Sequence, residues 1–112
     1  MALKFAKFNY FRSKKHLMNV ASLPCQRCGA EGETQAAHAN WVKYGKGRGI
    51  KASDEYTAAL CQHCHYLIDQ HPALSKLERQ TMWEYAWRKT VRELVKQDLW
   101  SPDVEVPRLE DA

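Results

Sequence analysis

The fold is decided by residues 60–69, Leu60-Cys61-Gln62-His63-Cys64-His65-Tyr66-Leu67-Ile68-Asp69. Two cysteines separated by two residues form a knuckle, in which both sulfurs turn toward one point. A second knuckle of the same spacing lies upstream, Cys25-Gln26-Arg27-Cys28, and the two knuckles use all four cysteines of the chain. Four thiolates favour tetrahedral Zn²⁺ and leave no position for water. The sequence therefore predicts a structural zinc held by Cys25, Cys28, Cys61 and Cys64, with a redox dithiol or a rubredoxin-type iron site as the alternatives.

Regular elements are expected on both sides of the second knuckle. Short strands are predicted near residues 34–40 and 56–60, and a helix from about Cys64 to Gln70, which His71-Pro72 ends because proline disfavours helix in the residue before it. A longer helix follows, and Ser75 with Glu78 predicts a capping box at its start. Its predicted apolar face carries Trp83, Trp87, Val91, Leu94 and Val95.

The chain of 112 residues fits one domain of the α+β class. We expect this domain to span residues 1–100, with a basic arm over 1–20 that contains a short helix near 13–21, a zinc core over 25–71 and a C-terminal helix within 74–100. Residues 101–112 are expected to be a poorly ordered acidic tail.

Charge is distributed unevenly along the chain. Residues 1–51 carry ten Lys or Arg against two acids, a balance of +8, whereas residues 52–112 carry seven against eleven, a balance of −4. A basic half favours a polyanion partner, of which DNA is the first candidate, and a solvated basic surface is the alternative. No apolar run is long enough to cross a bilayer, and no signal-peptide core follows Met1, so we expect a cytoplasmic protein with no membrane partner.

Histidine and aspartate residues near the knuckles are candidates for a second, catalytic site. His65 and Asp69 are four positions apart on the predicted helix, where an imidazole and a carboxylate can bind one divalent ion from the same side. His38 ends the first predicted strand, and Asp54 comes just before the second. Two of these four residues have a structural alternative, since His38 can be a core histidine and Asp69 a solvated helix residue.

This arrangement resembles the HNH, or ββα-metal, nucleases. The shared pattern is a knuckle, a strand ending in His38, a Gly-rich loop, a polar residue at Asp54, and the Cys-His step of Cys64-His65. It is similar to small phage and prophage members of the Ref recombination-enhancement type, which act with a recombinase. The resemblance covers about residues 12–71 and implies a ββα-metal core with flanking helices in a bacterial, phage or prophage protein.

The resemblance also implies roles. His38 matches the general base, His65 the metal-binding histidine of the helix, and Asp69 a second helical ligand for Mg²⁺ or Mn²⁺. Asp54 stands where the family usually has Asn, and either ligates the metal or orients His38. The sequence departs from the family at Ala37, where many members have a metal ligand; Asp54, Asp69 and His71 remain open as its replacement.

The Gly-rich loop between the strands carries three basic residues. Lys46, Arg48 and Lys51 are spaced by glycines in Tyr44-Gly45-Lys46-Gly47-Arg48-Gly49-Ile50-Lys51, and are well placed for backbone phosphates of DNA, either free or as a recombinase-coated strand. A mobile, solvated loop is the alternative. Three functions thus stay open: a metal-dependent DNA endonuclease, a zinc module that binds nucleic acid without cutting it, and a protein-interaction domain that docks through the helix with Trp83 and Trp87.

Overall fold

The structure is a computed structural model that describes residues 10–109. Within them, two antiparallel strands form a hairpin, β1 (Thr34–His38) and β2 (Thr57–Cys61), in a register that pairs Thr34 with Cys61 and His38 with Thr57. Four helical segments surround it: α1 (Lys14–Ala21), the short 3₁₀ segment η1 (Val42–Tyr44), α2 (Gln62–Gln70) and α3 (Lys76–Lys96). The predicted α+β class and the order of its elements are confirmed. The first nine residues of the expected basic arm lie outside the described part.

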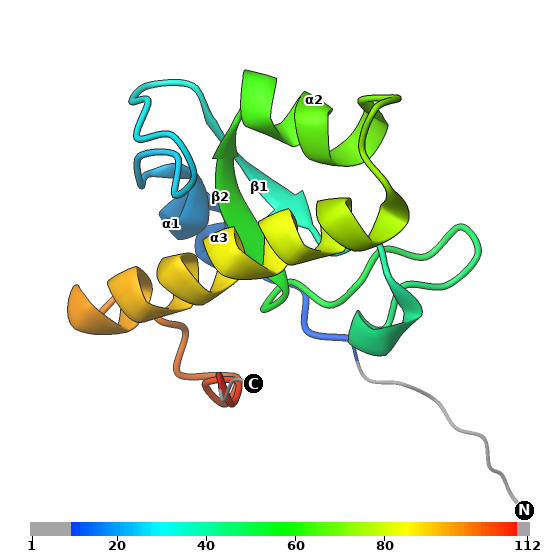
Figure 1. The fold of residues 1–112 in the computed structure, drawn as a ribbon. Coiled ribbons are helices and arrows are strands. Elements are labelled where there is room, and N and C mark those ends of the chain that lie inside the picture. The colour runs from blue at the N-terminus through cyan, green and yellow to red at the C-terminus, as the bar shows by residue number, and fades with distance from the viewer. Residues whose placement is uncertain (1–9, 110–112) are drawn as a thin grey trace, which may run out of the picture.

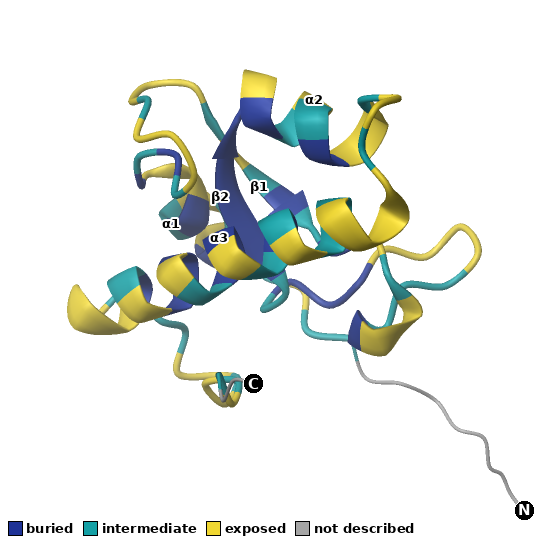
Figure 2. Ribbon diagram, viewed as in Figure 1, coloured by how far each residue is buried: buried dark blue, intermediate teal, exposed yellow. Residues whose placement is uncertain are grey.

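Helices cover both faces of the hairpin, and α3 contributes side chains to both. On one face, Ala58 and Leu60 of β2 pack with Ile68 of α2 and with Trp83 and Trp87 of α3. On the other face, Ala59 packs with the following residues: Val20, Leu23 and Leu94. Figure 1 shows α3 crossing in front of β2, with α1 behind it. Every residue of β2 is buried (Figure 2) because helices cover both of its faces.

The ends of the helices follow from local capping. Ser13 accepts a hydrogen bond from the His16 N–H and caps α1. Ser75 and Glu78 form the predicted capping box at the start of α3, with both reciprocal hydrogen bonds present. Helix α2 begins at Gln62, earlier than expected, because the thiol sulfur of Cys61 accepts the backbone N–H of Cys64 and acts as the cap. It ends where predicted, before Pro72.

The prediction for the apolar face of α3 was wrong at one residue, Val95. The side of α3 that packs on the sheet is made of Trp83, Ala86, Trp87, Thr90, Val91 and Leu94. Val95 is 47% exposed, because the buried side advances by three and four residues from Trp83 through Ala86 and Thr90 to Leu94. Thr90 is used as a polar anchor, since its hydroxyl oxygen accepts the N–H of Ala59 at 2.9 Å on the outer edge of β2.

An aromatic cluster fixes the loop that follows β1. The rings of Trp83 and Trp87 stack with centroids 5.5 Å apart, and the ring of Tyr44 lies 5.2 Å from that of Trp83. Both indoles are also tied to the hairpin, because Trp83 Nε1 donates to the carbonyl of Ala37 at 3.0 Å and Trp87 Nε1 to that of Glu55 at 3.0 Å. The segment that leaves β1 is thereby anchored to α3.

Residues 101–109 contain no helix or strand. Their start is attached to the domain through Trp100, whose Nε1 donates to the Val104 carbonyl at 3.0 Å, and Leu109 packs against the larger core cluster. No helix within the described residues is long and apolar enough to cross a membrane.

Candidate metal centre and catalytic site

The two knuckles meet between β2 and the turn that follows α1. The ligand sulfurs of Cys25, Cys28, Cys61 and Cys64 all lie within 4.8 Å of one another, and the Cys28 and Cys61 sulfurs are 3.7 Å apart. Sulfurs bound to one tetrahedral zinc at about 2.3 Å are about 3.8 Å apart. These four cysteines can hold a metal ion such as zinc, as the sequence predicted.

Backbone and side-chain donors surround the sulfurs. The N–H groups of Arg27 and Cys28 both donate to Cys25 Sγ at 3.4 Å, and the Arg27 guanidinium donates to Cys64 Sγ at 3.4 Å. Burial raises the pKa of the Cys25 thiol, but the surrounding N–H donors outweigh burial and lower this pKa to about 6. The backbone N–H of Ala30 lowers the pKa of the Cys28 thiol, but the neighbouring Cys61 and Cys25 sulfurs outweigh it and raise this pKa. Without a metal, the deprotonated form is therefore favoured at Cys25 only within the first knuckle.

His38 and Asp54 form a second group at the end of β1. His38 Nε2 lies 2.8 Å from Asp54 Oδ1, and the side chain of Asp54 is only 4% exposed. The same carboxylate accepts the Ser13 N–H at 2.7 Å and the Arg12 guanidinium at 3.2 Å. Burial raises the pKa of Asp54, but these donors together lower it below its usual value. Asp54 is therefore held as an ionised group beside His38.

Arg12 is in turn fixed by the Gly-rich loop. Its guanidinium donates to the carbonyls of Ala52 at 2.6 Å and Lys51 at 2.8 Å. Ser53 accepts the Phe11 N–H at 2.6 Å, so the segment before α1 is attached to the segment before β2. Sequence reasoning missed Arg12 and Ser13, since no local pattern links them to a carboxylate about forty residues away.

His65 and Asp69 form a third group on α2. His65 Nε2 lies 3.0 Å from Asp69 Oδ2, while His65 Nδ1 lies 2.6 Å from Gln35 Oε1. With Nδ1 donating to the Gln35 amide oxygen, Nε2 is the nitrogen that would face a metal; in the structure it lies against the Asp69 carboxylate. Two adjacent ligand atoms on an octahedral ion at about 2.1 Å are about 3 Å apart. The 3.0 Å separation is that of an ion pair and is also compatible with two neighbouring ligands of one divalent ion. Gln35 fixes the His65 ring.

The second and third groups lie on opposite faces of the hairpin. His38 points toward the α1 face with Asp54, whereas Gln35 points toward the α2 face with His65, as the alternation of side chains along β1 requires. No hydrogen bond or ion pair among residues 10–109 joins the two groups. The carboxylate of Asp54 contacts His38 and lies on the opposite face from His65 and Asp69. Its contacts therefore support the role of orienting His38.

The remaining predicted residues lie outside these groups. His71 caps the end of α2 and its Nδ1 accepts the Ala73 N–H at 3.1 Å. Arg48 and Lys51 are exposed, and Lys46 is half-buried with its ammonium donating to the Gly47 carbonyl at 3.0 Å. The loop is closed by a bridge between Gly47 and Ile50. The basic residues of this loop are therefore carried by a turn of defined backbone structure.

The chain was compared with protein-family models, with curated proteins and with solved structures, and none of the three comparisons finds a match.

Proposed function

We propose that this chain is a metal-dependent DNA endonuclease of the HNH type, built on a ββα-metal core with a structural zinc. The observation that carries the proposal is the His38–Asp54 contact. A histidine at the end of a strand has one ring nitrogen, Nε2, held at 2.8 Å by a buried carboxylate, and Nδ1 has no protein partner among residues 10–109. This is the arrangement of an oriented general base.

In the proposed reaction, the phosphodiester lies across the end of β1, between the two faces of the hairpin. His38 accepts a proton from the attacking water through Nδ1, while Asp54 holds the ring and stabilises the imidazolium that forms. His65 and Asp69 would hold a divalent ion, and that ion would supply positive charge to offset the charge at phosphorus and at the leaving oxygen. The expected products carry a 5′-phosphate and a 3′-hydroxyl, as the family resemblance implies.

The geometry of the chain after β1 supports this placement. Asn40, two positions beyond His38, lines one cavity together with Asp69 of the proposed metal pair. The chain thus passes from the proposed base to the proposed metal site within a few residues. The basic loop with Lys46, Arg48 and Lys51 follows directly, where it can neutralise flanking phosphates.

The experiment is a cleavage assay with zinc-loaded protein on single-stranded, duplex and recombinase-coated DNA. Cleavage should require added Mg²⁺ or Mn²⁺; omitting the added ion is a cleaner control than a chelator, which would also strip zinc. His38→Ala should lose about 10²–10⁴-fold in rate. His63→Ala is the matched control, because His63 is an exposed histidine inside the second knuckle.

A non-catalytic zinc module that binds nucleic acid is the second candidate function. It is favoured by the separation of His38 from the His65–Asp69 pair on opposite faces, and by Ala37 at a position where the resembling family has a ligand. A module of this kind binds DNA in a salt-dependent way without cutting it. If wild type and His38→Ala are equally inert on all three DNA forms while binding persists, this second function replaces the first.

A further inference from the structure

We propose that the cavity between α2, α3 and the chain leaving β1 receives one nucleobase of a single-stranded DNA, stacked on Trp41. The inference rests on the proposed function, because it adds a substrate subsite beside the proposed metal pair. The cavity has a volume of about 380 Å³, which lies within the range of small-ligand pockets. Asp69 forms part of its wall, so a nucleotide held here has its phosphate close to the proposed metal pair.

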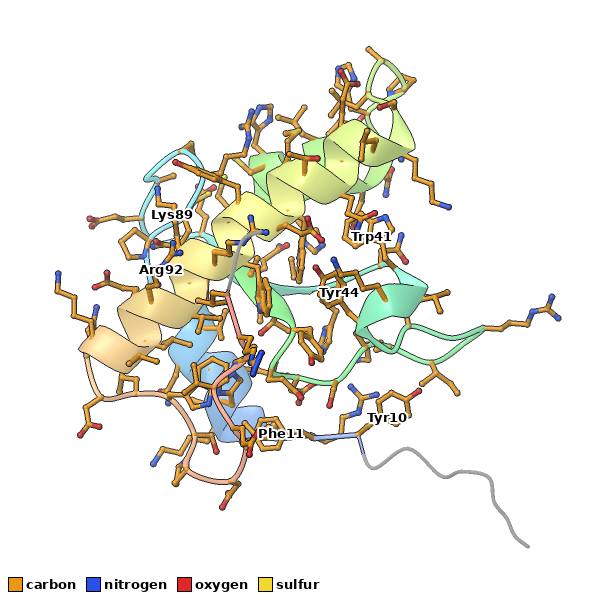
Figure 3. The ribbon with its side chains drawn as sticks, turned by 60° about the horizontal axis from the view of Figure 1, so that its bottom comes forward. Tyr10, Phe11, Trp41, Tyr44, Lys89 and Arg92 are labelled. Carbon is orange, nitrogen blue, oxygen red and sulfur yellow. The ribbon has the colours of Figure 1, made fainter. Side chains whose placement is uncertain are left out.

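Trp41 gives the cavity an aromatic wall that is fixed in place. Its ring is half-buried and packs on Trp83 with centroids 5.7 Å apart and planes tilted by 53°. Its carbonyl accepts the Tyr44 N–H at 2.9 Å, which holds its backbone at the start of η1. In Figure 3, Trp41 lies beside one part of α3, well away from Lys89 and Arg92. A tryptophan that is immobilised yet partly open loses little entropy when a base stacks on it.

The other walls suit the rest of a nucleotide. The half-buried Leu74 supplies apolar surface for the flat face of a base, with the buried Ile68 behind it. The exposed Asn40 offers both a donor and an acceptor to the edge of the base. Two cations, Lys76 and Arg79, also line the cavity and match a phosphate. A site lined by an aromatic ring, an amide and two cations fits a nucleotide better than an apolar ligand.

Arg79 makes the cavity a preformed feature. Its guanidinium donates to the carbonyl of Asp69 at 3.0 Å and to that of His71 at 2.6 Å, which satisfies the last carbonyls of α2. The same side chain thus fixes the end of α2 against α3 and places a positive charge in the wall. Binding then requires little rearrangement of the protein.

The geometry assigns this subsite to a single strand. A base inside a duplex is stacked and paired, so it cannot enter a side cavity without first being flipped out of the helix at a cost in free energy. An unpaired base enters freely, and stacking on one aromatic side chain strengthens binding by roughly 5- to 150-fold. We therefore expect the protein to prefer single-stranded DNA that carries bases over the same backbone without them.

The test measures binding in the absence of added divalent ions, so that no cleavage is needed. Fluorescence anisotropy compares a labelled oligothymidylate with an oligomer of equal length whose sugars are abasic. Wild type should bind the oligothymidylate roughly 5- to 150-fold more tightly. Trp41→Ala should abolish this ratio and leave abasic binding unchanged, whereas Trp41→Phe should keep most of it. Tyr85→Ala is the matched control, since Tyr85 is an aromatic residue of α3 that is 61% exposed.

Each outcome decides the inference. Equal binding of both oligomers by wild type, or an unchanged ratio in Trp41→Ala, overturns it. If Trp41→Ala fails to retain zinc, Trp41→Leu replaces it, because leucine keeps an apolar contact to Trp83 without offering a stacking face. A base preference that depends on Trp41, in a protein that never cleaves DNA, retains the subsite and rejects the nuclease.

Discussion

Asp54 holds His38 through a 2.8 Å contact between Oδ1 and Nε2, and its other oxygen accepts the Ser13 N–H at 2.7 Å. The carboxylate thus connects the end of β1 to the start of α1. An oriented histidine of this kind keeps one ring nitrogen directed outward, which is what a general base requires.

Asp54→Asn should lower DNA cleavage by about 10²–10⁴-fold, because an amide can hold the histidine in the wrong tautomer and no longer stabilises the imidazolium. Zinc content should not change, since Asp54 does not contact the four cysteines. Single-turnover rates with Mn²⁺ measure the effect. Full activity in Asp54→Asn would exclude a role for the carboxylate in the reaction.

Cys61→Ser should remove the bound zinc and unfold the protein near room temperature, because a structural zinc supplies much of the folding free energy of so small a domain. His63→Ala, a change within the same knuckle, should keep one zinc per chain. Elemental analysis and thermal melts followed by circular dichroism report both properties. A Cys61→Ser protein as stable as wild type would contradict the zinc site.

Gln35→Leu should weaken the binding of a second metal, Mn²⁺, to the zinc-loaded protein by about 10- to 100-fold, because the side chain that orients the metal-binding histidine would be removed. Gln62→Leu is the control, since Gln62 lines the same surface pocket as His65, whose ring is hydrogen-bonded to Gln35. Titration calorimetry or Mn²⁺ electron paramagnetic resonance gives the affinities. Equal Mn²⁺ affinity in the two variants would argue against the His65–Asp69 site.

Replacing Lys46, Arg48 and Lys51 together by Ala should weaken DNA binding and reduce the slope of log K against log salt by about 2–3, because each cation that neutralises a phosphate adds close to one to this slope. A triple Ala variant of Lys89, Arg92 and Lys96 removes the same charge from exposed positions on α3 and should change the slope little. Equal effects in both triples would mean that net charge alone attracts DNA.

His16→Phe should stabilise the protein. His16 is 1% exposed, neither of its ring nitrogens has a hydrogen-bond partner within the described residues, and its ring packs edge-on against that of Trp100 at 4.8 Å. Phe keeps a flat ring and removes two unpaired polar atoms, which cost about 1–3 kcal/mol. Urea unfolding at pH 7 measures the gain.

The same variant should change the pH dependence of stability. Burial lowers the pKa of His16 below its usual 6.5. The unfolded chain therefore binds the proton first as the pH falls through 6.5, so wild type loses stability from that point down to the lowered pKa of the folded state. The difference in unfolding free energy between His16→Phe and wild type should widen over this window. A constant difference from about pH 8 to about pH 5 would contradict the neutral, buried histidine.

Much of the fold was predictable because its signals are local. Knuckle spacing, the Ser75 capping box and the proline after His71 each act within a few residues, and the structure bears them out. The face of α3 was predicted except at Val95, where a helical repeat alone could not show that Thr90 takes the inward position and bonds to β2.

The sequence identified most residues of the candidate site, but it did not show which of them lie close together. Alternation along β1 places His38 and Gln35 on opposite faces, yet the sequence does not reveal which helix covers which face. The contacts of Asp54 with Arg12 and Ser13 depend on chain segments about forty residues apart. The sequence did not point to Trp41 as a binding residue, because the cavity beside it forms only when α2 and α3 pack together.

Cys61 is at once the last residue of β2, the cap of α2 and a member of the four-sulfur cluster. Removal of a metal bound there would therefore act first on the beginning of α2, one helical turn before His65 and two before Asp69. We expect a zinc-depleted chain to open locally there, with α2 the earliest segment to exchange its amide hydrogens and the first to be cut by proteases. Zinc supply would thus govern how long the protein survives in a cell, as well as whether it folds.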